Sequence, residues 1–269
     1  MTRITPLYAA LCALAIGTAT TAPHAATAMD SDDLAQVTVL PGWRMKNGNH
    51  MAALQITLKE GWHTYWRAPG GSGIPPRFDW GGSDNLAGVG LHWPVPTVYG
   101  QNGMRYIGYE DALVLPVEIV PDAAGNIELS GEISYGVCMD ICMPMTSAFA
   151  TTLDATDTAP DPRITAALAE RPHTVTGAKC AADAIKDGMR IAATLNLPKI
   201  GNQVVAVIEH PDHDVWVSEA TITQDGSRVT ATSDLVPPTA APFAIDRSTL
   251  TITVIDEGTA YEARGCTGG

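Results

Sequence analysis

The sequence has little positive charge and, after residue 28, no long hydrophobic run. Its 269 residues include 16 Lys and Arg against 29 Asp and Glu, giving a net charge of −13, and the basic residues form no cluster. Phosphate binding needs a basic patch, so we exclude nucleic acid as a partner, and the same acidity disfavours an anionic membrane surface. Crossing a bilayer takes about 20 apolar residues, so we expect no membrane insertion of the chain after residue 28.

Two catalytic signatures are also missing. No Ser lies in a Gly-x-Ser-x-Gly element, which excludes the nucleophile elbow of many hydrolases. No Cys-x-x-Cys of the thioredoxin type occurs. The His-Pro-Asp-His-Asp run at 210–214 is explained more simply as a polar turn than as a metal site, and His63 as a packed or surface histidine. We therefore predict no cofactor.

The N-terminus has the features of an export signal. Arg3 precedes an apolar run over 7–19, and the small residues Ala26-Thr27-Ala28 follow. This order predicts a secretory signal peptide over residues 1–28, with cleavage before Met29. Cys12 follows Leu11, where a lipoprotein signal needs a small residue, so we expect no lipid anchor. The acidic, Arg-poor chain favours a bacterial periplasm as its location.

Alternation of apolar and polar residues is common, and helical periodicity is scarce. Period-two runs occur at 54–58, 113–119, 127–135, 189–197, 205–207, 215–217, 229–231 and 250–254. Such runs between Gly, Pro, Asn and Asp clusters indicate antiparallel strands. We predict an all-β fold of two immunoglobulin-like β-sandwich domains, at 29–155 and 176–269, joined by a linker with a short helix at 156–175.

The linker holds the clearest helix signal. Asp161 can cap a helix and Pro162 suits its first turn, while Ile164, Ala167 and Leu168 share one face. The pattern predicts a helix over 161–170, ended by Pro172.

Cysteine spacing separates two roles. Of five cysteines, Cys12 belongs to the predicted signal, which leaves four and three possible pairings. The spacing favours Cys138–Cys142 and Cys180–Cys266. Chain-entropy arithmetic gives about 2 kcal/mol for the short loop and about 4–5 kcal/mol for the long one. The long pair is therefore the better structural staple, and the short pair is a candidate reversible couple.

Two other interpretations of the short pair stay open. It can be an inert local disulfide, in which case the protein is a structural adaptor. Alternatively, Cys138 and Cys142 can bind Cu(I) together with Met139, Met143 and Met145, because soft sulfur ligands select that ion. The second alternative implies copper tolerance or delivery as the function.

Region 59–109 is rich in aromatic residues, Gly and Pro. It contains four of the six Trp, namely Trp62, Trp66, Trp80 and Trp93. Aromatic loops of this kind pack tightly and often build binding surfaces. We expect the region to cover the open end of the sandwich, to cap a reactive group, or to do both.

Three segments together carry a resemblance. They are GWHTYWRAPGGSGIPPRFDW at 61–80, WPVP at 93–96 and YGVCMDICMP at 135–144. Over residues 40–153 the chain resembles the N-terminal periplasmic module of the DsbD-type thiol:disulfide interchange proteins, most closely the ScsB-like branch. Residues 175–269 resemble it only in strand pattern.

The resemblance implies a thiol:disulfide oxidoreductase of the protein-disulfide reductase type. A membrane-embedded thiol reductase would reduce the pair, which would then reduce periplasmic thioredoxin-like or disulfide-isomerase-like proteins. Cys142, the cysteine followed by x-Pro, would be the nucleophile, and Cys138 the resolving thiol. The aromatic loop would shield the sulfurs, and the residues expected around them are Tyr65, Trp66, Tyr135 and Pro144.

Overall fold

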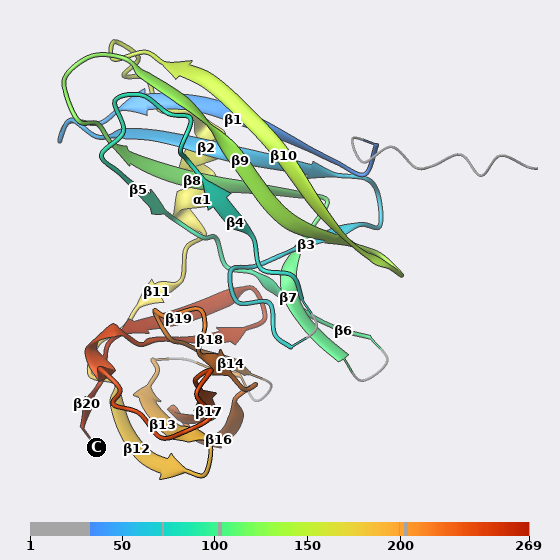
Figure 1. The fold of residues 1–269 in the computed structure, drawn as a ribbon, viewed down its shortest axis with the longest axis vertical. Helices are drawn as coiled ribbons and strands as arrows, with labels where there is room; N and C mark the ends of the chain where they lie inside the picture. The colour runs from blue at the N-terminus through green and yellow to red at the C-terminus, as the bar shows by residue number, and fades with distance from the viewer. Residues whose placement is uncertain (1–32, 72, 102–103, 199, 202–203, 269) are drawn as a thin grey trace, which may run out of the picture. The chain divides into compact units, whose positions relative to one another are not determined.

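β-Strands dominate the structure, a computed structural model (Figure 1). It describes residues 33–71, 73–101, 104–198, 200–201 and 204–268. The predicted signal peptide, including Cys12, lies outside these residues. Within the described part of the chain, no helix has the length and apolar character that crossing a membrane requires. The all-β fold is confirmed.

Residues 35–153 form two sheets that face each other. One has the strand order β1-β2-β8-β5, and the other has the order β10-β9-β3-β7-β6, with β4 pairing β9. The strands are β1 (Ala35–Arg44), β2 (His50–Leu58), β3 (His63–Tyr65), β4 (Arg77–Asp79), β5 (Gly88–Leu91), β6 (Thr97–Gln101), β7 (Met104–Glu110), β8 (Ala112–Val120), β9 (Ile127–Cys138) and β10 (Cys142–Leu153).

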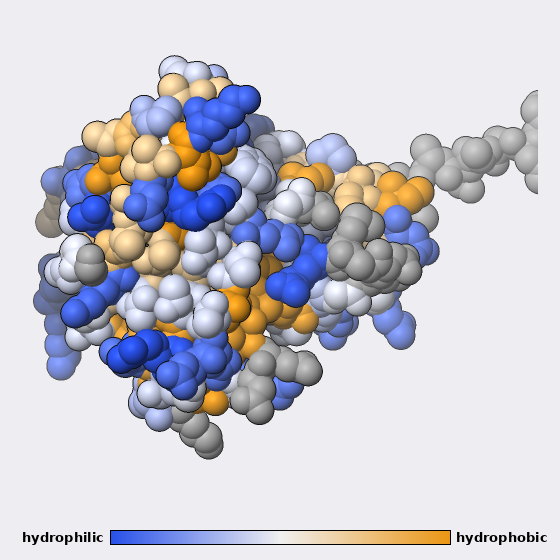
Figure 2. All heavy atoms as spheres, turned by 90° about the horizontal axis from the view of Figure 1, so that it is seen from below, coloured by the Kyte–Doolittle hydropathy of each residue, from blue (hydrophilic) through white to orange (hydrophobic). Residues whose placement is uncertain are grey.

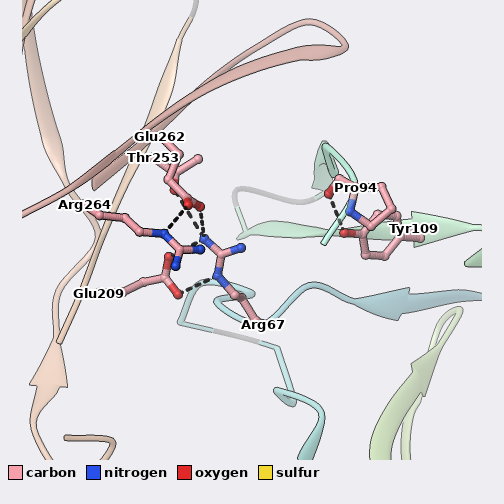
Figure 3. Close-up of polar contacts among 7 residues, drawn as sticks. All are labelled: Arg67, Pro94, Tyr109, Glu209, Thr253, Glu262 and Arg264. Atoms are coloured by element: carbon pink, nitrogen blue, oxygen red, sulfur yellow. Dashed lines mark hydrogen bonds and ion pairs between the residues drawn. The ribbon is translucent and has the colours of Figure 1, made fainter. Parts of the chain in front are cut away.

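The core between these sheets comes from the alternating residues of both. Leu54 and Leu115, on the first sheet, are buried in the same cluster as Ile133 and Phe149 on the second. Successive side chains on a strand point to opposite faces, so one face of each strand fills the core. The WPVP segment joins this core, because the buried hydroxyl of Tyr109 donates to the carbonyl of Pro94 at 2.8 Å (Figure 3).

The predicted helix is present as α1 (Pro162–Ala169), with Asp161 as its N-cap. The Asp161 carboxylate accepts a hydrogen bond from the backbone N–H of Arg163 at 2.8 Å. Fully buried Ile164 packs with Met51 and Ala53 of β2. The helix therefore covers the face of the first sheet that is turned away from the core, which explains why β2 is apolar on both faces in its first half.

Residues 173–268 form two further sheets. Their orders are β11-β19-β18-β14 and β15-β17-β13-β12-β20, with β16 also pairing β17. The strands are β11 (His173–Thr174), β12 (Lys179–Ile185), β13 (Gly188–Asn196), β14 (Val205–Glu209), β15 (Trp216–Val217), β16 (Thr221–Asp225), β17 (Arg228–Val236), β18 (Thr251–Asp256), β19 (Thr259–Arg264) and β20 (Thr267–Gly268), with a 3₁₀ turn at Arg247–Thr249.

A disulfide joins the beginning and end of this second strand set. Cys180 on β12 bonds Cys266, just before β20, across 86 residues of sequence, and the Cys180 side chain is fully buried. By their contacts, residues 31–269 form one unit, and the domain boundaries at 155–156 and 175–176 stay predictions.

Exposed apolar side chains are few among the described residues. Figure 2 shows one face, on which hydrophobic residues reach the surface between hydrophilic ones. The large hydrophobic side chains that are exposed in the described part of the chain are Val120, Met139, Ile141 and Trp216. Two of these, Met139 and Ile141, lie in the turn between β9 and β10.

Candidate functional site

The β9–β10 hairpin brings the two motif cysteines together. The strands pair in continuous register from Ile127↔Leu153 to Cys138↔Cys142, and they run side by side in Figure 1. The cysteines are thus the last cross-strand pair before the turn, with a Cα–Cα distance of 4.2 Å, and their sulfurs are bonded. Chain reversal over only three residues places the disulfide at the end of the hairpin.

The two sulfurs differ in their access to solvent. The Cys138 side chain is 1% exposed, whereas Cys142 is an exposed residue. Met139 and Ile141 are 44% and 72% exposed beside it. A thiol or thiolate of another protein can therefore reach the Cys142 sulfur, while the Cys138 sulfur faces the interior.

Tyr65 contacts both sulfurs. Its hydroxyl oxygen lies 2.8 Å from Cys138 Sγ and 3.0 Å from Cys142 Sγ. Disulfide sulfurs carry no hydrogen, so the hydroxyl is the donor in both contacts. Strand β3 sets this position, because it pairs with the end of β9 and Thr64 donates from its hydroxyl to the Gly136 carbonyl at 2.9 Å.

Two glycines make room for the Tyr65 ring. A Cβ at Gly136 would lie 2.8 Å from the ring and 2.7 Å from Ile74 Cβ, and a Cβ at Gly73 would lie 2.9 Å from the other edge of the ring. We call residues 66–76 the covering segment; Ser72 within it lies outside the described residues. The Tyr65 ring is held between this segment and β9.

An aromatic cluster adjoins the ring. His63 stacks on Tyr106 at 4.1 Å between ring centroids, and Tyr106 stacks on Tyr99 at 4.9 Å. The edge of Tyr65 meets His63 at 5.5 Å. Burial lowers the pKa of His63 and raises the pKa of Tyr65. Both side chains are therefore neutral at neutral pH, and His63 is a packed histidine, 6% exposed.

Arg67 anchors the start of the covering segment. Its guanidinium donates to Glu209 of β14 at 2.9 Å and to Glu262 of β19 at 2.6 Å (Figure 3). It also lies 4.2 Å above the ring of Trp66. Burial, the largest influence, lowers the pKa of Arg67, but the two carboxylates outweigh it, so the net direction is upward and the guanidinium stays positively charged.

The other residues expected around the sulfurs lie in two different environments. Trp66 and Tyr135 are buried in the core of the first sheet pair, and Tyr135 shares a hydrogen bond with Ser147 at 3.1 Å. Tyr135 lies three positions before Cys138, so strand alternation turns the two side chains to opposite faces. Pro144 is exposed, next but one to Cys142, on the edge strand β10, where a missing backbone N–H is tolerated.

The three methionines of the copper interpretation do not share a face. Met143 packs against the core and Met145 is buried in it, whereas Met139 is exposed. Alternation along β10 places Met143 and Met145 on the face opposite Cys142. Among the described residues, no group of three or more His, Cys, Asp and Glu is placed to hold a metal.

The fold and this hairpin define a protein class: an immunoglobulin-like double-sandwich protein with a Cys-x3-Cys disulfide at the end of a hairpin, where the Tyr65 hydroxyl contacts both sulfurs. Residues 29–154 match the family described as thiol:disulfide interchange protein DsbD, N-terminal. These residues belong to that family as a domain of the DsbD N-terminal type.

A solved structure shares the fold over most of the chain. It is described as the N-terminal periplasmic domain of ScsB from Proteus mirabilis, with 23% identity and a TM-score of 0.65. The match covers 90% of this chain and 96% of that one, so it includes both strand sets. The predicted immunoglobulin-like fold is confirmed. No curated protein matches the sequence.

Proposed function

We propose that this protein is a periplasmic thiol–disulfide exchange protein that carries electrons between a membrane-embedded thiol reductase and periplasmic thioredoxin-like or disulfide-isomerase-like proteins. The observation that carries this proposal is the unequal exposure of the two bonded cysteines, Cys142 exposed and Cys138 buried, within a domain of the DsbD N-terminal type. An exchange protein needs one sulfur that partners can reach and a second that completes the reaction internally.

In the first half of the cycle, the reductase supplies the electrons. Its thiolate attacks Cys142 Sγ, the Cys138–Cys142 bond breaks, and Cys138 leaves with the electron pair as a thiolate that takes up a proton. A second thiolate of the reductase then attacks the reductase sulfur of the mixed disulfide, and Cys142 is released as a thiolate. The pair has then gained two electrons and one proton, which is on Cys138, while Cys142 is a thiolate and the reductase is a disulfide.

In the second half, the electrons pass on. The Cys142 thiolate attacks a disulfide of the partner protein, and one partner sulfur leaves as a thiolate. Cys138 then gives up its proton, and its thiolate attacks Cys142 Sγ, which restores the internal disulfide and releases the second partner thiolate. The partner gains two electrons and, from solvent and from Cys138, two protons. Rates depend on thiolate fraction and access, which favours Cys142 for the intermolecular steps.

Two cysteine variants test this assignment. In cells expressing Cys138→Ser, we expect mixed disulfides between Cys142 and partner proteins, visible as bands on non-reducing gels and lost with reductant. Cys142→Ser should give none, and the double variant is the matched control. Trapping through Cys138 in the Cys142→Ser protein, or no trapping by either, would contradict the proposal.

A redox titration tests the pair without a known partner. We expect the Cys138–Cys142 couple to titrate well above the roughly −300 mV of structural bridges, while Cys180–Cys266 stays oxidised. Thiol-reactive mass tags distinguish the two bridges. If both disulfides resist reduction over the same range of potentials, the result would support the structural adaptor instead.

The periplasmic location is supported by the predicted signal over residues 1–28 and by the periplasmic description of the similar Proteus mirabilis domain. Mass spectrometry of the osmotically released protein should find Met29 as the first residue. Retention of the full chain in the cytoplasm would contradict this part of the proposal.

A further inference from the structure

Cleavage of the disulfide at Cys142 creates a buried negative charge. The leaving sulfur belongs to Cys138, whose side chain is only 1% exposed. An ionised group that loses water without a replacement partner is strongly disfavoured. The reaction therefore needs a hydrogen-bond donor inside the protein, close to this sulfur.

The Tyr65 hydroxyl is in that place. It lies 2.8 Å from Cys138 Sγ, and the Tyr65 side chain is itself 2% exposed. Burial raises the pKa of Tyr65, so its hydroxyl keeps its proton at neutral pH and remains a donor. Hydrogen bonds to charged groups are about twice as strong as those between neutral groups.

The charged groups nearby do not offer a substitute. The titratable groups on the surrounding elements are His63 on β3, Tyr99 on β6, Arg105, Tyr106 and Glu110 on β7, Glu128, Glu132 and Tyr135 on β9, Asp140 in the hairpin turn, and Lys59 and Glu60 in the turn before β3. Burial lowers the pKa of His63, so it brings no positive charge at neutral pH. The cations Lys59 and Arg105 are exposed, and Glu110 and Asp140 oppose a thiolate. The neutral hydroxyl of Tyr65 is the donor that contacts both sulfurs.

The hydroxyl is also held in position. The ring is confined by Gly136 on one side and by Gly73 on the other. A donor fixed before the reaction stabilises developing charge without reorganising during it. The same hydroxyl lies 3.0 Å from Cys142 Sγ, so it can donate a hydrogen bond to whichever of the two sulfurs is ionised.

We propose that Tyr65 is a catalytic residue whose hydroxyl donates a hydrogen bond to the Cys138 thiolate. In the reduction step this thiolate is the leaving group, and in the release step it is the attacking group. The proton stays on Tyr65 throughout, and the electron pair moves between Cys138 and the S–S bond. The proposal rests on the proposed exchange function and assigns the step that Tyr65 assists.

The test is the replacement Tyr65→Phe, which keeps the ring and removes the hydroxyl. In a Cys142→Ser background, Cys138 is the thiol at this site, and its thiolate is followed by absorbance at 240 nm against pH. Losing one charge-assisted hydrogen bond should move the titration midpoint up by about one pH unit, a tenfold drop in thiolate fraction. In the protein with both cysteines, reduction by dithiothreitol at pH 7 should slow about tenfold.

Tyr106→Phe is the matched control, because it removes a hydroxyl from the adjoining ring and should leave both quantities unchanged. Equal midpoints for Tyr65 and Tyr65→Phe, in protein that still exchanges thiols, would overturn the role of Tyr65 alone. Loss of exchange in the unsubstituted protein would instead overturn the proposed function.

Discussion

Gly136→Ala should disturb the packing around Tyr65, the residue that contacts both sulfurs of the disulfide. The added Cβ would lie 2.7 Å from Ile74 Cβ and 2.8 Å from two carbons of the Tyr65 ring. Real Cβ atoms do not approach carbon this closely. The Cβ of Ile74 is bonded directly to the backbone and cannot move by a rotamer change. Thr64, next to Tyr65, donates a hydrogen bond to the Gly136 carbonyl, which holds Tyr65 close to Gly136.

The magnitude follows from two opposing contributions. Overpacking a well-filled site costs about 1–3 kcal/mol. Replacing Gly by Ala also reduces the entropy of the unfolded chain, which stabilises the fold by about 0.4–1 kcal/mol. We therefore expect the free energy of unfolding to fall by about 1–2 kcal/mol. If the strain is relieved by displacing the covering segment, Cys138 becomes accessible and the disulfide is reduced faster.

Two measurements check this prediction. Urea unfolding gives the free energy, and mass tagging after timed exposure to dithiothreitol gives the reduction rate of Cys138–Cys142. Gly88→Ala is the control, since a Cβ there would meet Val120 at an ordinary 3.9 Å and should leave both quantities nearly unchanged. If Gly136→Ala matches Gly88→Ala in both stability and reduction rate, the covering segment does not press on β9 as described.

Three further changes have defined outcomes. Glu262→Gln weakens the ion pair of Arg67 and should lower the free energy of unfolding by about 2 kcal/mol in urea titrations. An unchanged free energy of unfolding would refute the stabilising role of this ion pair. Burial lowers the folded-state pKa of His50 and His63, so the unfolded chain binds more protons just below pH 6.5. Stability should then fall as the pH drops from about 6.5 to 5, and a flat urea midpoint over this window would contradict it. Ile164→Ala empties a fully buried site under α1 and should cost about 2–4 kcal/mol, whereas a loss below 1 kcal/mol would mean that α1 is not packed there.

Local patterns predicted much of the architecture. The alternation at 54–58 and 113–119 became β2 and β8, because one face of each strand fills the core. The capping residue Asp161 and the apolar face after it gave α1 within one residue at each end. These features depend on residues within a few positions of one another along the chain, so they can be predicted from the local sequence.

The details of the site depend on contacts between distant residues. Tyr65 reaches the sulfurs only because β3 pairs with the end of β9, a contact across more than 70 residues that no local pattern encodes. The same pairing brings the Tyr65 ring against Gly136, where a Cβ would lie 2.8 Å from it. One signal was available, however. Strand alternation already places Tyr135 and Cys138 on opposite faces, which argues against Tyr135 as a neighbour of the sulfurs.

The covering segment relates the second strand set to the disulfide. The segment begins beside Tyr65, and Arg67 within it pairs with carboxylates on β14 and β19. Those strands belong to the sheet β11-β19-β18-β14. Without them the Arg67 guanidinium would lose its ionic partners and keep only the Trp66 ring. The ion pairs therefore fix one end of the segment that confines the Tyr65 ring. The second strand set thus contributes to the geometry of a disulfide that it does not contain.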